Sequence, residues 1–523
     1  MSPAPSFLVI MTDQQRADHL GCYGNDIVQT PHIDALAARG VRFERFYVSN
    51  PICQPNRAAL ATGQLTTVNG CRKNGIPLSR DSTTYADVLR SAGYRTGLVG
   101  KAHFQNVSPI AAKPPAYKGP GVPPMAPYDR AVRTQRAGPA YEQEIRSHWI
   151  QDPDREVPRP YYGFDDLALC IGHGDQVEGH YTRWLQDRLD GGPDPRGRER
   201  ALPEARSGTP QLWRTALPEA LYPTQFVGEA ACAFLQETPP DTPFLLVVSF
   251  PDPHHPFTPP GRYFDMYDPG DIPLPASFHH PTRERTDLPA HLQRVYEIGD
   301  TSPDAYWPFH TDAETVRRMI ALNYGAISMI DDWVGRILQA LQDTGQAETT
   351  DVVFMSDHGD YMGDHGTVLK HGVHSQGLIR VPLIWSAPGH DAPDTTALQG
   401  SAIDFAPTLL ARAGLAPPVG MQGRDLLATD AENLPVLIED AGLSFADPHG
   451  PTASRTLVHD AWRMTLFEGS ELGELYDLTA DPNELSNLWA EPSAAARRAR
   501  MLHLLADRQM ALQDVSLVPT HQA

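Results

Sequence analysis

The chain has 523 residues, 41% of them hydrophobic and 20% charged, a composition typical of a globular protein with a large core. Its 43 Lys and Arg and 64 Asp and Glu give a formal net charge of −21, which disfavours nucleic acid and anionic membrane surfaces as partners. No apolar run approaches the ~20 residues of a membrane span, and the short apolar N-terminus is not typical of a signal peptide. The 5 cysteines match neither a zinc motif nor a disulfide framework, so we expect a cytoplasmic protein.

Short apolar runs along the chain are typical of buried strands in a parallel sheet. These runs are Phe7–Thr12, Thr96–Val99, Phe244–Phe250 and Val352–Ser356. Helix-start and helix-stop signals alternate with them, and they delimit helices over 30–40, 84–93 and 313–343. The alternation predicts an α/β sandwich, in which helices flank a large, mostly parallel central sheet.

Two regions depart from this alternation. Residues 105–220 are rich in Pro and have no clear periodicity, so we expect a lid-like insertion that covers the active-site face. Residues 431–523 predict a smaller α+β subdomain, because three short strands precede a helix at 494–512. Its strands are expected at Pro435–Glu439, Arg455–His459 and Arg463–Phe467. The remaining 1–430 would form the catalytic domain.

The segment Cys53-Gln54-Pro55-Asn56-Arg57 predicts the start of a helix. Pro suits the first turn, the residues after Arg57 favour a helix, and Gly63 is a suitable stop. Cys53 would then lie at the helix N-terminus, where the macrodipole favours an ionised nucleophile. A free Cys is also often a small buried apolar side chain, and the pentapeptide alone leaves both interpretations open.

Ionisable residues follow each predicted strand. Asp13 ends the first and Lys101 the second, His254 comes just after the third, and Asp357-His358 end the fourth. In open α/β sheets, ligands bind beyond the carboxyl ends of the strands. We therefore expect a catalytic site at this edge of the sheet.

The same residues predict a metal and an anion. Asp13-Gln14 and Asp357-His358 offer mainly oxygen ligands, which favour Ca²⁺, Mg²⁺ or Mn²⁺. Lys101, Lys370 and an arginine beside such a cation would repel one another unless an anion lay among them. The pattern therefore indicates a small anionic substrate.

Taken together, these blocks resemble those of the type I sulfatases, in family order and over almost the whole chain. The blocks are Thr12-Asp13-Gln14-Gln15-Arg16, Cys53-Gln54-Pro55-Asn56-Arg57, Gly100-Lys101-Ala102-His103, Ser356-Asp357-His358-Gly359 onward to Lys370, Arg380-Val381-Pro382 and Glu474-Leu475-Tyr476-Asp477-Leu478. The resemblance implies the alkaline-phosphatase-like fold and a divalent metal, usually calcium, with manganese or magnesium as alternatives. It also implies that a maturation enzyme oxidises Cys53 to Cα-formylglycine.

The resemblance assigns roles to individual residues. It implies metal ligation by Asp13, Gln14, Cys53, Asp357 and His358. It implies catalytic roles for Cys53, Arg57, Lys101, His103, His254 and Lys370, with His254 as the acid for the leaving alcohol and His103 as the base that releases sulfate. Candidate substrate contacts are Asn74, His371 and His374, and in the 105–220 segment His173 and His180.

The expected activity is hydrolysis of an aryl, alkyl or carbohydrate sulfate ester by a metal-held formylglycine hydrate. Gln14 and His358 replace the acid and amide of many arylsulfatases and also occur in phosphonate monoester hydrolases, whereas Lys101 and His103 favour a sulfatase. A phosphonate monoester hydrolase or phosphodiesterase is therefore the main alternative. An inactive binding homologue is a further one, and Cys53 argues against a phosphatase or mutase. The sequence leaves open whether the chain forms a homo-oligomer.

Overall fold

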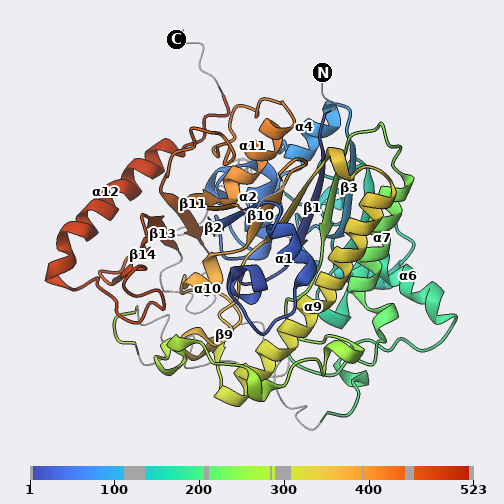
Figure 1. Ribbon diagram of the computed structural model, residues 1–523, viewed down its shortest axis with the longest axis horizontal. Helices are drawn as coiled ribbons and strands as arrows, with labels where there is room; N and C mark the ends of the chain where they lie inside the picture. The colour runs from blue at the N-terminus through green and yellow to red at the C-terminus, as the bar shows by residue number, and fades with distance from the viewer. Residues whose placement is uncertain are drawn as a thin grey trace, which may run out of the picture.

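The computed structural model describes residues 4–110, 136–204, 211–282, 285–288, 308–390, 394–441 and 453–517. A nine-stranded mixed sheet crosses the molecule in the order β11-β2-β10-β8-β1-β6-β3-β4-β5, with helices on both faces (Figure 1). Its strands are β1 (Ser6–Thr12), β2 (Val41–Tyr47), β3 (Arg95–Lys101), β4 (Asp166–Ile171), β5 (Glu178–Gly179), β6 (Phe244–Ser249), β8 (Thr350–Ser356), β10 (Leu383–Ser386) and β11 (Asp394–Ser401).

The middle of the sheet is parallel. Strands β8, β1, β6, β3 and β4 run in one direction, and Ile10 of β1 lies between Val248 of β6 and Phe354 of β8. Because helices cover both faces, these strands are continuous apolar runs, as the sequence predicted. Their carboxyl ends therefore meet at one edge. β10 is antiparallel to both of its neighbours, β8 and β2, and β5 is antiparallel to β4.

Side chains alternate between two cores. Phe7, Val9 and Met11 of β1 pack into one core, and Leu8 and Ile10 pack into the other. The helices of the first core are α2 (Cys53–Thr62), α4 (Tyr85–Ser91) and α11 (Ala402–Arg412). Those of the second are α1 (Pro31–Ala37), α7 (Pro223–Glu237) and α9 (Ala313–Asp343). The predicted α/β sandwich is confirmed.

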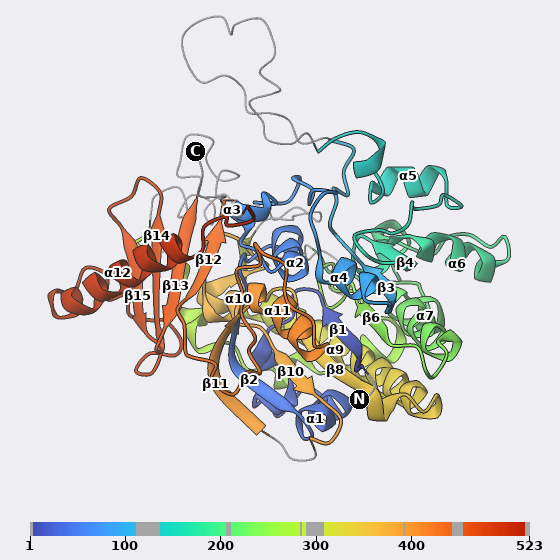
Figure 2. The same ribbon diagram turned by 90° about the horizontal axis from the view of Figure 1, so that it is seen from above.

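A smaller antiparallel sheet occupies one side of the molecule, with α12 (Ala495–Ala511) beside it (Figure 2). Its strands are β12 (Val436–Asp440), β13 (Ser454–His459), β14 (Trp462–Phe467) and β15 (Gly473–Asp477). Arg463 is buried here and donates to Glu474 at 2.7 Å. The sheet and the helix were predicted, but β15 was not. The boundary between 1–430 and 431–523 stays a prediction.

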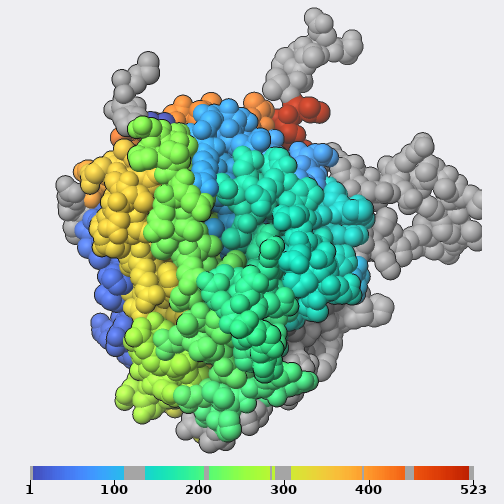
Figure 3. All heavy atoms as spheres, turned by 90° about the vertical axis from the view of Figure 1, so that its right-hand side faces the viewer, coloured from blue at the N-terminus to red at the C-terminus, as the bar shows by residue number. Residues whose placement is uncertain are grey.

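The segment 105–220 contributes to the central sheet, which its sequence did not predict. β4 pairs with β3 and carries β5 at the edge, while α5 (Arg146–Gln151) and α6 (His180–Leu189) lie beside them. In Figure 3 the side chains of this region cover much of one face of the molecule. Residues 111–135 and 205–210 of the expected lid lie outside the described residues.

Short elements complete the fold. They are α3 (Thr66–Asn69), α10 (Gln376–Ile379) and the paired strands β7 (Phe309–His310) and β9 (Thr367–Val368). None of the described helices is long and apolar enough to cross a lipid bilayer.

Candidate active site

Arg57 ties the ends of three strands together. Its Nε donates to Asp357 Oδ2 at 2.7 Å, after β8, and its Nη1 donates to the Lys101 carbonyl at 2.7 Å and to Ser249 Oγ at 2.8 Å, at the ends of β3 and β6. The Gln14 amide, after β1, also donates to Asp357, at 3.0 Å. The four predicted strand ends therefore meet at one buried site.

Cys53 is the first residue of α2, as the sequence predicted, and Gly63 ends this helix with a φ of 62°. Its Sγ is buried, 3.1 Å from His358 Nε2 and 2.9 Å from Lys370 Nζ. Burial raises the pKa of this thiol, but Lys101 and Lys370 outweigh burial and hold the pKa well below its usual range. The surroundings therefore stabilise negative charge on the side chain of residue 53.

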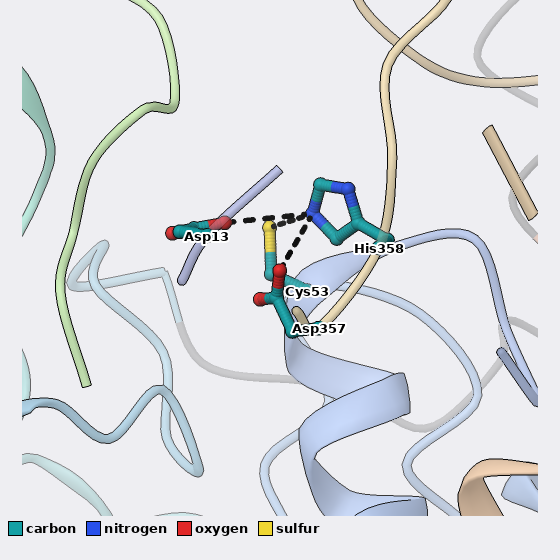
Figure 4. A group of neighbouring side chains, drawn as sticks. All are labelled: Asp13, Cys53, Asp357 and His358. Atoms are coloured by element: carbon teal, nitrogen blue, oxygen red, sulfur yellow. Dashed lines mark hydrogen bonds and ion pairs between the residues drawn. The ribbon is translucent and has the colours of Figure 1, made fainter. Parts of the chain in front are cut away.

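Ligand atoms of Asp13, Cys53, Asp357 and His358 all lie within 4.8 Å of one another (Figure 4). His358 Nδ1 donates to the Gly359 carbonyl at 2.8 Å, so its Nε2 faces this cluster. Such a set, built from two strand ends and a helix N-terminus, can hold one divalent cation.

Two orphaned oxygens test this fit. Asp13 Oδ1 and Gln14 Oε1 are buried and make no hydrogen bond to any described residue. The Gln14 backbone has a positive φ of 64°, and its Nε2 donates to Asp360 Oδ2, which leaves its own oxygen unpaired. Buried oxygens without partners cost free energy unless a cation or water satisfies them. The donor set therefore fits a cation that prefers oxygen ligands.

Two lysines flank this cluster. Lys101 Nζ donates to Asp13 Oδ2, and it holds the pKa of that carboxyl well below its usual range despite burial. Lys370 Nζ lies 2.8 Å from His254 Nε2. Burial and Lys370 lower the pKa of His254 to about 4, and its Nδ1 donates to the His255 carbonyl. These buried cations form a receptor for an anion.

The predicted base His103 lies just after β3 in a strained conformation with φ 55°. Its backbone amide donates to Glu144 Oε2 at 2.7 Å, and its buried Nδ1 makes no hydrogen bond to a described residue. Glu144 also accepts from the amides of Phe104 and Gln105. The carboxylate of Glu144 thus fixes the loop that carries His103.

The predicted substrate contacts differ in position. Asn74 is exposed, and its Oδ1 accepts from the Gln54 amide at 3.3 Å, next to Cys53. His371 is partly buried and has a φ of 118°. His374 is fully buried, 2.8 Å from Thr456 Oγ1 on β13. Only Asn74 has the exposure expected at the mouth of a site, and the substrate role of all three stays a prediction.

His180 also lies apart from the catalytic groups. Its Nδ1 accepts from the Leu169 amide at 2.9 Å, and its ring packs edge-on against Trp149.

Sequence reasoning missed three residues of the site. Asp360 orients Gln14, Glu144 orients His103, and His255 lies 3.0 Å from Gln14 Nε2. His255 follows the predicted acid His254 directly and Asp360 follows Asp357-His358 closely, so their positions were a usable signal. Glu144 lies in the Pro-rich segment, where no sequence signal marked it as part of the site.

This sheet, with a buried cysteine at a helix N-terminus and lysines at the strand ends, defines the class as hydrolases of the alkaline phosphatase superfamily. The chain belongs to the sulfatase family, because residues 5–415 match the model "Sulfatase". Residues 363–511 match "N-sulphoglucosamine sulphohydrolase, C-terminal".

Similar proteins span nearly the whole chain. An arylsulfatase of Clostridium perfringens is 27% identical over 92% of this chain and 90% of its own length. The uncharacterized sulfatase YidJ of Escherichia coli is 28% identical over 98% of this chain and 88% of its own length. The structure of a phosphonate monoester hydrolase of Agrobacterium radiobacter is 28% identical, covers 98% of this chain and 97% of its own, and has a TM-score of 0.78.

Proposed function

We propose that the protein hydrolyses a small aryl, alkyl or carbohydrate sulfate ester after a maturation enzyme has oxidised Cys53 to formylglycine. One observation carries this proposal. The residue 53 side chain belongs to a cluster of possible metal ligands and lies 2.9 Å from the ammonium group of Lys370. A tetrahedral anion beside residue 53 would meet positive charge on both sides.

Asp13, Gln14, Asp357 and His358 would hold a divalent cation, for which calcium is the first choice because the donors are mostly oxygens. Such a cation supplies Lewis acidity, which increases the nucleophilicity of an adjacent oxygen and neutralises developing charge. Formylglycine in its hydrated form carries two hydroxyl groups on one carbon, so one can attack sulfur and the other can later expel sulfate.

The other residues bind the ester and move protons. Arg57 fixes Asp357 and adds positive charge, while Lys101 and Lys370 bind the sulfuryl oxygens. As the attacking hydroxyl bonds to sulfur its proton passes to the Lys370–His254 pair, and the same pair gives a proton to the alcohol oxygen as the S–O bond to the alcohol breaks. The imidazole of His103 then takes the proton of the remaining hydroxyl at residue 53, the aldehyde re-forms and sulfate leaves.

A phosphonate monoester hydrolase is the second candidate. It is supported by the 28% identity and the TM-score of 0.78 to such an enzyme, and by Gln14 and His358 at the cluster. A phosphonate carries a carbon substituent where a sulfate has a bare oxygen, so it needs more room. Matched nitrophenyl sulfate and phenyl phosphonate esters separate the two candidates, and we expect a higher kcat/KM for the sulfate.

The proposal is tested by mass analysis of the proteolytic peptide that contains residue 53, together with turnover of this ester panel. Conversion removes one sulfur and two hydrogens and adds one oxygen. We expect the lighter peptide in active protein and a proportional rise of turnover with its fraction. Turnover that is independent of this fraction would rule out residue 53 as the nucleophile. An unmodified, metal-free and inactive protein would instead support a binding role.

A further inference from the structure

His173, from the turn after β4, lies against the groups that the proposed reaction uses. Its Nε2 is 2.7 Å from Lys101 Nζ and 3.5 Å from Asp13 Oδ2. Its ring stacks on the ring of His254, with centroids 3.6 Å apart and planes 9° apart. The His173 side chain is 18% exposed and that of Asp13 fully buried, so His173 lies toward the solvent side.

A second metal does not explain this arrangement. Asp13, His173 and His254 place one ligand atom each within 4.8 Å of the others. However, Nε2 of His173 faces the ammonium of Lys101, and Nε2 of His254 faces that of Lys370, at 2.7 and 2.8 Å. These two nitrogens already face lysine donors, and a further cation would share Asp13 with the first cluster and be repelled by the cation held there.

The turn that carries His173 is built to a fixed shape. Gly172 and Gly174 have φ values of 100° and 53°, and a Cβ at Gly174 would lie 2.7 Å from the Pro256 carbonyl oxygen. Asp175 is fully buried and accepts from Trp213 Nε1 at 2.9 Å and from Thr215 Oγ1 at 2.8 Å. Two glycines and a buried carboxylate therefore hold the imidazole of His173 in place.

His254 needs such support. Its edge is set by the bond from Nδ1 to the His255 carbonyl and by Lys370 at Nε2, and among the described residues the rings of His173 and His255 stack on it. The His255 ring also stacks on the His254 ring, with centroids 4.0 Å apart and an interplanar angle of 30°, which is less parallel than the stack of His173. Small changes in the angle of a proton donor reduce the rate of proton transfer.

We propose that His173 is a positioning residue, which holds the His254 ring in line with the leaving alcohol. This inference rests on the proposed function, in which the Lys370–His254 pair protonates that alcohol. Because His173 belongs to the 105–220 segment, protonation of the leaving group would depend on that segment.

The test is a double-mutant cycle on the matured holoenzyme with a good leaving group, nitrophenyl sulfate, and a poor one, an alkyl sulfate. We expect His173→Ala to lower kcat about tenfold for the alkyl sulfate, with KM and nitrophenyl turnover changed by less than about twofold. In a His254→Ala background the same substitution should change kcat by less than about twofold. Equal losses for both esters, or the full loss in the His254→Ala background, would overturn the proposal.

Two conservative variants separate stacking from the contact with Lys101. His173→Phe keeps the ring and should recover most of the alkyl sulfate activity, whereas His173→Gln keeps only a polar group and should not. Recovery by Gln alone, or by neither, would contradict the proposal. His503→Ala, on an exposed part of α12 beside Asp507, is the control and should leave both rates unchanged.

A crystal structure of His173→Ala gives a readout that does not require turnover. We expect the His254 ring to be rotated while metal content stays that of the parent protein. An unmoved ring would overturn the inference even if the protein proved to act on phosphonates. Absence of turnover in the parent protein, with a rotated ring in the variant, would refute the proposed function and leave the positioning role supported.

Discussion

The carboxyl edge of the sheet and the 105–220 segment contribute different things to the same site. The edge supplies charged groups, namely Asp13, Lys101 and Asp357, each directly at or after a strand end. The segment supplies Glu144 and His173, which contact those groups or their loops. Charged groups thus lie at the strand ends, and contacts that orient them come from a part of the chain without a clear sequence pattern.

This difference implies two classes of mutational effect. Loss of a strand-end group should remove catalysis and leave the fold intact, because the site gathers like charges at a cost in stability. Loss of a supporting residue should lower stability and rate together, because hydrogen bonds that shape a loop are broken.

The largest effect is expected for Cys53→Ser. Serine keeps the size of the side chain but has a single hydroxyl, so turnover of sulfate esters should fall by at least about 10³-fold. Thermal unfolding should be unchanged, since Cys53 makes its contacts with catalytic groups. Steady-state kinetics and calorimetry check this, and near-parental turnover would show that residue 53 is not the nucleophile.

Lys370→Met should lower kcat/KM by about 10²–10³-fold. Lys370 is buried beside two histidines, so removing its charge relieves desolvation, and the free energy of unfolding should stay equal or rise. Parallel kinetics and denaturant unfolding measure both quantities. A large loss of stability would show that Lys370 stabilises the fold. The distinction between catalytic groups and supporting residues would then not hold.

Glu144→Gln should have a smaller effect on rate and a clear effect on stability. The carboxylate accepts from three successive backbone amides and from Tyr161, and an amide NH₂ in its place would face one of these donors. We expect a loss of about 2 kcal/mol in the free energy of unfolding and about a tenfold fall in kcat. Glu142→Gln, two residues earlier and partly exposed, is the matched control.

The smallest kinetic effect is expected for His374→Ala. His374 is buried against Thr456 of the C-terminal sheet, so the substitution should lower the free energy of unfolding by about 2 kcal/mol and change KM by less than about twofold. Thr456→Val keeps the imidazole but removes its hydrogen bond to Thr456 and the 2.7 Å bond between Thr456 and Thr465, so a similar loss of about 2 kcal/mol is expected. A tenfold rise in KM would place His374 among the substrate contacts instead.

Much of the fold followed from local patterns. The helix at 313–343 was predicted to its ends from its apolar spacing, and the structure shows that Asp312 caps its N-terminus. β1 and β8 were visible as apolar runs that end just before Asp13 and Asp357. β2 and β4 were not, because partly buried strands carry mixed side chains, and β4 lies amid Pro-rich chain.

The residues of the site also divide into those that local sequence patterns predicted and those that they did not. Cys53 and Asp13 were found because a helix N-terminus and a strand end leave local marks in the sequence. The stack of His173 on His254 joins residues 81 positions apart (254 − 173), and nothing near either residue encodes it. Contacts of this kind depend on tertiary packing.

The most direct test of the central claim is a crystal structure of the matured protein with anomalous scattering data at its metal. The account predicts a single divalent cation bonded to Asp13, Gln14, Asp357 and His358, with an oxidised residue 53 beside it. An intact cysteine in active crystals, or a cation bound away from these side chains, would contradict it.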